Sequence, residues 1–390
     1  MSAAHRDVVT IDDLSDQDIE NIFQLADGYL ETMAPQDTPD RIRGKLDVAS
    51  GRIMATLFAE PSTRTRFSFE SAMLRLGGQV LAASDAASTS FSKGETIADA
   101  VRVVENYADL IVIRSPLEGA ARVAADFASV PVINGGDGSH QHPTQTLYDL
   151  YTLRREYPDW WRNRARKNLT VLLLGDLKNG RTIHSLVYAL ARFGVHIHVQ
   201  SAPGLGLPPH VQRRLHSDFN CQPIPGSVLK GTRKGFDAIY VTRFQAERSG
   251  SGEGAAYPVV DLKFLKAPQY RHARVLHPLP RVEELGYDLD QDPRAVYFKQ
   301  AAFGVPVRMA LITYLLSLDQ RVKTAAAARP IASRVAPDRK CPNARCVSNN
   351  PAESRHLAQR FYVVAHKPQT LRCIYCENEF TVEAKAKVLR

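Results

Sequence analysis

Short runs rich in apolar residues alternate with segments of helical periodicity through most of the chain. The runs are typical of strands buried in a parallel sheet, and they cover 52–58, 79–83, 108–113, 130–133, 169–174 and 195–201, with two more in "DAIYVT" and "ARVLHP". Helices are expected at 15–30, 64–76, 95–107, 116–128, 181–193 and 305–322. The alternation predicts an α/β protein with two domains, each with a parallel sheet covered by helices.

A run of hydroxyl and guanidinium side chains follows the first of these strands. It stands where the next helix is expected to begin and consists of Ser62, Thr63, Arg64, Thr65 and Arg66. A helix N-terminus offers free backbone N–H groups and the positive end of the helix dipole, and these side chains add further donors. The sequence therefore predicts a phosphate-binding turn, although a solvated helix cap with stray arginines explains the same residues.

Polar side chains also follow other predicted strands, where sites in parallel sheets are found. They are Arg114, His142, Gln145, Arg181, Arg243, Gln245 and the stiff segment Pro278-Leu279-Pro280, with Ser90 and Lys93 in a loop ahead of a helix. A single one of these is equally well explained as a structural histidine or a solvated arginine. Together they predict a small polyanionic substrate bound between the two domains.

The composition adds limits to this picture. The chain has 390 residues, of which 44% are hydrophobic and 23% charged, as in ordinary globular proteins. No apolar run is long enough to span a membrane, and the first residues lack the core of a signal peptide, so we expect a cytoplasmic protein without membrane contact. The sequence has no dinucleotide-binding G-x-G-x-x-G after its first strands, no P-loop and no G-x-S-x-G, which argues against a dehydrogenase, a P-loop kinase or a serine hydrolase and against a redox cofactor.

The last part of the chain differs in charge and in cysteine content. Residues 323–390 hold 13 Lys and Arg against 5 Asp and Glu, whereas the preceding part has 37 against 36. The cysteines of this part form a C-x4-C pair and a C-x2-C pair, Cys341, Cys346, Cys373 and Cys376, which predicts one structural zinc ion per chain. Cys221 has no partner in this pattern. The basic tail allows nucleic-acid binding, but it lacks the interleaved aromatic residues of a stacking surface, so nucleic acid is an unlikely partner.

Long motifs in this order resemble the aspartate carbamoyltransferase family. They are "FxEPSTRTRFSFE", "SxxKGET", "GDGxHQHPTQTLxDL", "GDLKNGRTxHSL", "VTRxQxER", "LHPLPR" and "GVPVRMAL", spread over residues 8–320. The tail "CPNARC…LRCIYCENEF" is similar to the zinc domain of that family's regulatory chain. The resemblance implies the transcarbamoylase fold with a small C-terminal zinc domain that has four cysteine ligands. Its parts would be a carbamoyl phosphate-binding domain (1–143 with 303–322), an aspartate-binding domain (144–302), a linker (323–340) and the zinc-binding domain (341–390).

The resemblance also implies roles for the polar residues. Ser62, Thr63, Arg64 and Thr65 would hold the phosphate of carbamoyl phosphate; Arg114, His142, Gln145 and Thr65 would surround its carbonyl oxygen, and the Pro278–Pro280 segment would accept from its NH2 group. Arg181, Arg243 and Gln245 would bind L-aspartate, and Ser90 and Lys93 would reach in on a loop from the neighbouring subunit of a homotrimer. The products would be N-carbamoyl-L-aspartate and phosphate, in pyrimidine biosynthesis. The zinc domain could join trimers into a larger homo-oligomer.

An ornithine carbamoyltransferase would share "STRTR" and "HPTQ" with this chain. That family typically has "HCLP" and an acidic-Ser-Met-Gly motif for its cationic substrate, whereas this chain has "HPLP" and "TRFQAER", which favour an acidic substrate. One departure from the resemblance is Phe303, at a position where many relatives have Asn, and its effect on domain closure does not follow from the sequence.

Overall fold

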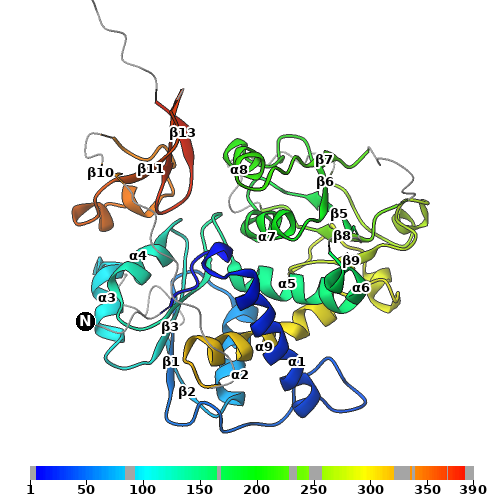
Figure 1. The fold of residues 1–390 in the computed structure, drawn as a ribbon, viewed down its shortest axis with the longest axis horizontal. Coiled ribbons are helices and arrows are strands. Elements are labelled where there is room, and N and C mark those ends of the chain that lie inside the picture. Colours follow the sequence, from blue (N-terminus) through cyan, green and yellow to red (C-terminus); the bar gives the residue numbers. More distant parts are fainter. Residues whose placement is uncertain are drawn as a thin grey trace, which may run out of the picture.

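The computed structural model describes residues 6–83, 93–164, 168–227, 235–245, 257–319, 334–335, 339–366 and 368–382. In these residues the strands form two parallel sheets and one antiparallel sheet, so the predicted α/β architecture with two domains is confirmed (Figure 1). The first sheet has the order β2-β1-β3-β4 and consists of β1 (Ile53–Phe58), β2 (Gln79–Ala83), β3 (Leu110–Ser115) and β4 (Val132–Asp137).

Three helices connect the strands of this sheet: α2 (Thr63–Arg75), α3 (Ile97–Val104) and α4 (Ala120–Phe127). β3 is buried along its whole length, as expected of an inner parallel strand. The two edge strands differ: β2 is largely exposed, whereas β4 is buried and pairs with the segment at Val8. The chain turns sharply after α2 at Gly77, which has φ +95°. A Cβ atom there would lie 2.6 Å from the backbone oxygen of Leu46, so the turn requires glycine.

The second sheet is also parallel, with the order β7-β6-β5-β8-β9. Its elements are β5 (Thr170–Gly175), α7 (Arg181–Arg192), β6 (His196–Ser201), α8 (Pro209–Phe219), β7 (Ile224–Pro225), β8 (Ala238–Val241) and β9 (Arg274–Leu276), with the short 3-10 helices η5 (Phe264–Lys266) and η6 (Tyr287–Gln291). Each of the predicted strands in this half is found within a few residues of its expected position.

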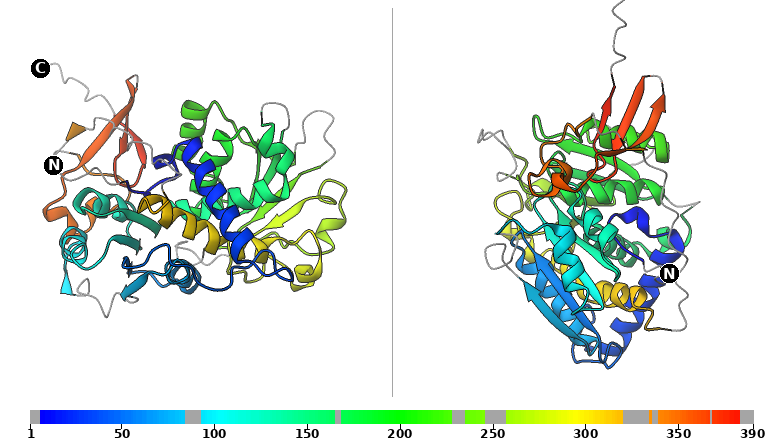
Figure 2. Two further views of the ribbon diagram at one scale, coloured as in Figure 1. Left: turned by 60° about the horizontal axis from the view of Figure 1, so that its bottom comes forward. Right: turned by 90° about the vertical axis from the view of Figure 1, so that its left-hand side faces the viewer.

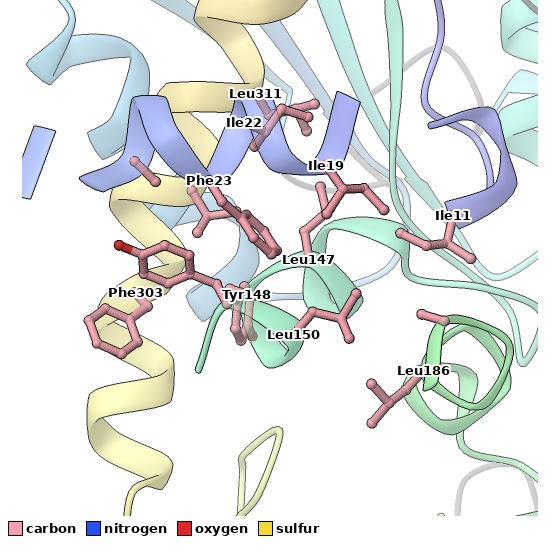
Figure 3. Close-up of a cluster of buried hydrophobic side chains, with 14 of the residues drawn as sticks. Ile11, Ile19, Ile22, Phe23, Leu147, Tyr148, Leu150, Leu186, Phe303 and Leu311 are labelled. Carbon is pink, nitrogen blue, oxygen red and sulfur yellow. The ribbon is translucent and has the colours of Figure 1, made fainter. Parts of the chain in front are cut away.

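Helices between the two sheets join the domains through one continuous core (Figures 1 and 3). These helices are α1 (Asp16–Met33), α5 (Pro143–Glu156) and α9 (Tyr297–Leu315); η1 (Ile11–Asp13) precedes α1 and α6 (Pro158–Arg162) follows α5. Ser15 caps α1 by accepting a hydrogen bond from the backbone N–H of Asp18, as the sequence predicted. None of the described helices is long and apolar enough to cross a lipid bilayer.

Helix α9 begins eight residues before its expected start at residue 305. Pro306 lies inside the helix, where close packing on α1, α2 and α5 holds the backbone in place. Phe303 is fully buried in this helix, and the edge of its ring meets Tyr151 of α5 with ring centroids 5.1 Å apart. It is therefore a core residue at the contact between α5 and α9.

The C-terminal part forms a small antiparallel sheet with the order β10-β11-β12-β13. It contains β10 (Arg334–Val335), η7 (Val347–Asn349), η8 (Glu353–Arg355), β11 (Arg360–His366), β12 (Gln369–Cys373) and β13 (Glu379–Thr381). We call residues 341–382 the cysteine module. It packs beside α3 and α4 and shares a hydrophobic cluster with them (Figure 2). The approach is so close at Gly119 that a Cβ atom there would lie 2.6 Å from Tyr375.

Candidate active site

A cavity of about 1070 Å³ opens where the carboxyl ends of the strands in both sheets face each other. Thirteen residues that the sequence singled out line it: Ser62, Thr63, Arg64, Thr65, Arg114, His142, Gln145, Arg181, Arg243, Gln245, Pro278, Leu279 and Pro280. They come from the segments after β1, β4, β5, β8 and β9 and from β3 itself, which is the arrangement expected for a site in parallel sheets. Two further candidates are not in this group. Lys93 is exposed and does not line the cavity, and Ser90 lies outside the described residues.

The N-terminus of α2 forms one wall of the cavity. Ser62 is the N-cap residue, but its side chain makes no capping hydrogen bond, so its hydroxyl and the first N–H groups of the helix stay available for an anion. Thr65 is buried in the first turn, and its Oγ1 lies 3.5 Å from Nε2 of His142. The helix dipole makes this end of the cavity positive.

The charge of the lining is strongly one-sided. Among the described lining residues, one is acidic, Glu60, and six are arginines: Arg64, Arg114, Arg181, Arg243, Arg308 and Arg345. Burial and, to a smaller extent, the nearby Arg243 lower the pKa of Arg64. A ligand with several negative charges would relieve their repulsion.

Glu60 bridges the two domains, and the sequence analysis missed it. Its Oε1 accepts a hydrogen bond from Nη2 of Arg114 (2.8 Å), and its two oxygens accept from both terminal nitrogens of Arg181, with Nη1 at 3.1 Å from Oε2. The two arginines also donate to backbone oxygens, Arg114 to that of Gly135 (3.1 Å) and Arg181 to that of Gly138 (2.9 Å). The glutamate directly before "PST" in a strand-end motif was the available signal.

Arg308 was missed as well, although a charged residue in the apolar segment "GVPVRMAL" is unusual. It is 2% exposed, donates to Oγ of Ser68 (2.9 Å) and Oγ1 of Thr144 (3.3 Å), and lies over the ring of Phe69 at 4.7 Å. Its Nε has no hydrogen-bond partner among the described residues. Burial lowers the pKa of Arg308, so a nearby anion would stabilise its charge.

The segment after β9 is held in shape by His277. The backbone N–H of Leu279, which has φ +52°, donates to Nδ1 of His277 (2.8 Å), while Nε2 lies 2.8 Å from Oε1 of Glu284. Burial lowers the pKa of His277, which favours the neutral ring with its proton on Nε2. The two prolines and this local bond leave the segment stiff where it faces the cavity.

The four cysteines of the module meet at one point, as predicted. Cys341, Cys346, Cys373 and Cys376 are buried, and their sulfur atoms all lie within 4.8 Å of one another. The sulfurs of Cys341 and Cys376 are 3.6 Å apart, and those of Cys346 and Cys373 are 3.8 Å apart. Four thiolates about 2.3 Å from a tetrahedral Zn²⁺ ion would be roughly 3.8 Å apart, so the residues fit such an ion.

The module is tied to both domains. Oε2 of Glu377 lies 3.1 Å from Nε2 of His140, two residues before His142, and 3.0 Å from Nη1 of Arg214 on α8. Burial disfavours a charged ring, but the adjacent Asp137 and Glu377 raise the pKa of His140 well above its usual value. Arg345 pairs with Glu118 at 2.8 Å and reaches the lining of the cavity, a contact that the sequence did not reveal.

Models of protein families match nearly the whole chain. The carbamoyl-P binding domain of aspartate/ornithine carbamoyltransferases matches residues 6–155, and the Asp/Orn binding domain of the same family matches residues 167–315. The metal binding domain of the aspartate carbamoyltransferase regulatory chain matches residues 339–385.

Individual proteins agree with these matches. The aspartate carbamoyltransferase catalytic subunit of Thermococcus gammatolerans is 47% identical over 318 residues, which are 80% of this chain and 98% of that protein. The catalytic subunit of M. jannaschii aspartate transcarbamoylase has 40% identity and a TM-score of 0.67, covering 80% of this chain and 98% of its own. The Trypanosoma cruzi aspartate transcarbamoylase in complex with carbamoyl phosphate and aspartate has 32% identity and a TM-score of 0.68, covering 79% and 96%. The chain therefore belongs to the aspartate/ornithine carbamoyltransferase family and carries, in the same polypeptide, a metal-binding domain of the aspartate carbamoyltransferase regulatory-chain type.

Proposed function

We propose that the protein is an aspartate carbamoyltransferase, which transfers the carbamoyl group of carbamoyl phosphate to L-aspartate and releases N-carbamoyl-L-aspartate and phosphate, a step of pyrimidine biosynthesis. The observation that carries this proposal is the charge of the cavity, whose described lining holds six arginines, the N-terminus of α2 and a single carboxylate. Both substrates are anions with more than one charge, and such a lining would bind them together.

The positions of the residues suggest a division of the cavity between the substrates. In this proposal the N-terminus of α2, with Ser62, Thr63, Arg64 and Thr65, holds the phosphate. Arg114 and His142 donate to the carbonyl oxygen, and the backbone oxygens of Pro278 and Leu279 accept from the NH2 group. Arg181, Arg243 and Gln245 lie on the side of the second sheet, where they would bind the two carboxylates of aspartate.

The chemistry needs positioning and charge. The neutral amine of aspartate attacks the carbonyl carbon, the carbonyl oxygen gains negative charge, and donors already in place stabilise it by a few kcal/mol each, about 3 kcal/mol for a well-aimed one. The C–O bond to phosphate then breaks, and the departing phosphate takes the proton of the amine. Holding both substrates in one cavity removes the entropic cost of their meeting.

Ornithine fits this cavity less well than aspartate. Its side chain is a cation and requires an acidic partner, but the one carboxylate in the described lining, Glu60, is already bound by Arg114 and Arg181. A cationic side chain would be placed among arginines and repelled.

Steady-state assays with carbamoyl phosphate and either amino acid test the proposal. We expect product with L-aspartate and none with L-ornithine. Arg243→Gln should raise the KM for aspartate at least tenfold, whereas Arg162→Gln, which removes a guanidinium that is 69% exposed and far from the cavity, should leave it unchanged. Turnover of ornithine in place of aspartate would contradict the assignment.

We also propose a homotrimer with shared active sites, as the resemblance implied. Lys93 is exposed and does not line the cavity of its own chain, so in this proposal it serves a neighbouring subunit together with Ser90. We also propose that the metal in the cysteine module is one structural zinc ion, since four buried thiolates at tetrahedral spacing suit Zn²⁺. Any further association of trimers would involve the module.

A further inference from the structure

A buried carboxylate beneath the cavity, Asp149, accepts hydrogen bonds from three separate elements. It lies on α5, is completely buried and does not line the cavity. Gln145 of α5 donates to it at 2.8 Å, Tyr240 of β8 at 2.8 Å and Gln300 of α9 at 2.6 Å. It thus joins α5, the second sheet and the closing helix α9 at one point.

The first of these bonds fixes how Gln145 faces the cavity. An ionised carboxylate can only accept hydrogen bonds, so the NH2 group of Gln145 must turn toward Asp149. The oxygen of the same amide then lies on the other side, where it accepts from the hydroxyl of Tyr148. Tyr148 and Gln145 both line the cavity, so the amide oxygen, which has a second lone pair, lies on the side of Gln145 that carries this cavity-lining tyrosine. The NH2 group, held by Asp149, is not directed at the carbonyl oxygen, where the resemblance had placed Gln145.

The third bond reaches the opposite wall. Gln300 donates to Asp149 with its NH2 group, and its oxygen accepts from the backbone N–H of His277 at 2.9 Å. His277 leads into the Pro278–Pro280 segment and also holds Leu279 in place. Asp149 therefore supports, through Gln300, the second group of acceptors that lines the cavity.

We propose that Asp149 is a positioning residue for the carbamoyl group: it orients the amides of Gln145 and Gln300 so that acceptors on two walls face the carbamoyl NH2. This inference rests on the proposed function. The carbamoyl NH2 is the donor that tells carbamoyl phosphate apart from inorganic phosphate, so Asp149 acts on recognition of the carbamoyl group and not of the phosphate.

The burial of Asp149 supports a functional role, because a carboxylate at this position costs stability. Burial raises the pKa of Asp149 to about 7, opposed by the hydrogen bonds from Gln300, Tyr240 and Gln145 and by the charge of Arg308. An ion at this position is costly, and an amide or apolar residue would be cheaper for the core alone. The acceptor-only character of a carboxylate is what the three donors require.

Asp149→Leu tests this directly, because it nearly keeps the size of the side chain and removes Oδ1, the acceptor that Gln145 and Gln300 share. The amide of Gln145 is then no longer held and can present NH2 to the cavity. We expect the KM for carbamoyl phosphate to rise at least tenfold at pH 8, while the inhibition constant of inorganic phosphate changes less than twofold. An equal rise in both constants, or no rise in the KM, would overturn the proposal.

Two controls separate positioning from general damage. Asp18→Asn alters another buried carboxylate, which is bound by Ser15, Tyr314 and Arg6 far from the cavity, and it should lower stability without changing either constant. Tyr240→Phe removes a donor that leads to neither acceptor wall, so both constants should stay within twofold.

Gln300→Leu covers the case in which Asp149→Leu does not fold, since it keeps Asp149 and its bond to Gln145 and removes the link from Asp149 to His277. It should raise the KM for carbamoyl phosphate about tenfold with unchanged inhibition by phosphate, and an unchanged KM would overturn the proposal on this side too. Calorimetric binding of carbamoyl phosphate and of phosphate to the unsubstituted protein distinguishes the two hypotheses. If both bind but no aspartate is carbamoylated, the proposed function fails. The positioning role is still tested in that case, by comparing the affinities for carbamoyl phosphate and for phosphate between the unsubstituted protein and the variants.

Discussion

Replacing Glu60 by glutamine should loosen the contact between the two domains and increase the affinity of the cavity for anions. The carboxylate holds Arg114 at the end of β3 and Arg181 at the start of α7, and these two elements belong to different sheets. Without its charge, two buried guanidinium groups face each other, and the glutamine oxygen can satisfy only part of their donors.

The size of the effect follows from the burial of the three side chains. Glu60 is 21% exposed, Arg114 10% and Arg181 7%. Removing one partner of a fully buried ion pair costs roughly 3–5 kcal/mol, and exposed pairs contribute about 0–1 kcal/mol. We therefore expect a loss of about 2 kcal/mol. Since 1 kcal/mol shifts the Tm of a domain of 150–250 residues by roughly 2–4 °C, the Tm should fall by about 4–8 °C.

Thermal unfolding with and without inorganic phosphate measures both consequences. Phosphate supplies the missing negative charge, so it should raise the Tm of Glu60→Gln more than that of the unsubstituted protein. The kcat should fall at least tenfold, because the domains no longer hold both substrates in register. Asp159→Asn, which breaks an ion pair between side chains 62% and 69% exposed, is the control. A Tm equal to that of the control, with no added effect of phosphate, would refute the bridging role.

Three further predictions concern the metal, the assembly and the pH dependence. Elemental analysis under reducing conditions should find one zinc ion per chain; Cys373→Ser should lose it and Cys221→Ser should keep it, and a protein without zinc would contradict the site. Lys93→Ala and Arg181→Ala chains, each nearly inactive, should recover about a quarter of the activity when dissociated, mixed and reassembled, whereas recovery near zero would place Lys93 in the site of its own chain. Burial raises the pKa of Asp149 to about 7, above the roughly 3.9 of an unfolded chain, so the folded state holds this proton more tightly. The free energy of unfolding should then fall as the pH rises from about 4 through 7; Asp149→Asn should lose this component of the slope in urea titrations, and an identical slope would contradict the shift.

Local signals predicted much of the fold because parallel strands and capped helices leave their pattern in short segments. The run at 52–58 became β1, the run at 169–174 became β5, and Ser15 caps α1. The carboxyl ends of these strands brought thirteen of the expected site residues into one cavity. The side chains that each segment places in the cavity depend on its own residues and on the general geometry of parallel sheets. They could therefore be predicted before the fold was known.

Helices buried on all sides were harder to recognise. α5 is buried from Pro143 to Leu153 and includes the polar residues Gln145 and Asp149, so it shows no apolar stripe with a polar opposite face. The same reason hid the start of α9, where polar Gln300 is buried. The sequence analysis singled out Gln145 of this network, but it missed Asp149 and Gln300, which lie in the helical segments that it did not recognise.

The docking of the cysteine module could not be read from the sequence, because its contacts join residues that are far apart in the chain. Oε1 of Glu353 accepts from the backbone N–H of Ile97 at 2.8 Å and so serves the N-terminus of α3, while Glu377 meets His140 and Arg214. A count of charges described this part of the chain as basic, yet its carboxylates Glu353 and Glu377 bond to the body alongside Arg345. One acidic residue next to Cys376 thus contacts both domains and links the four-cysteine cluster to the segment that leads into His142.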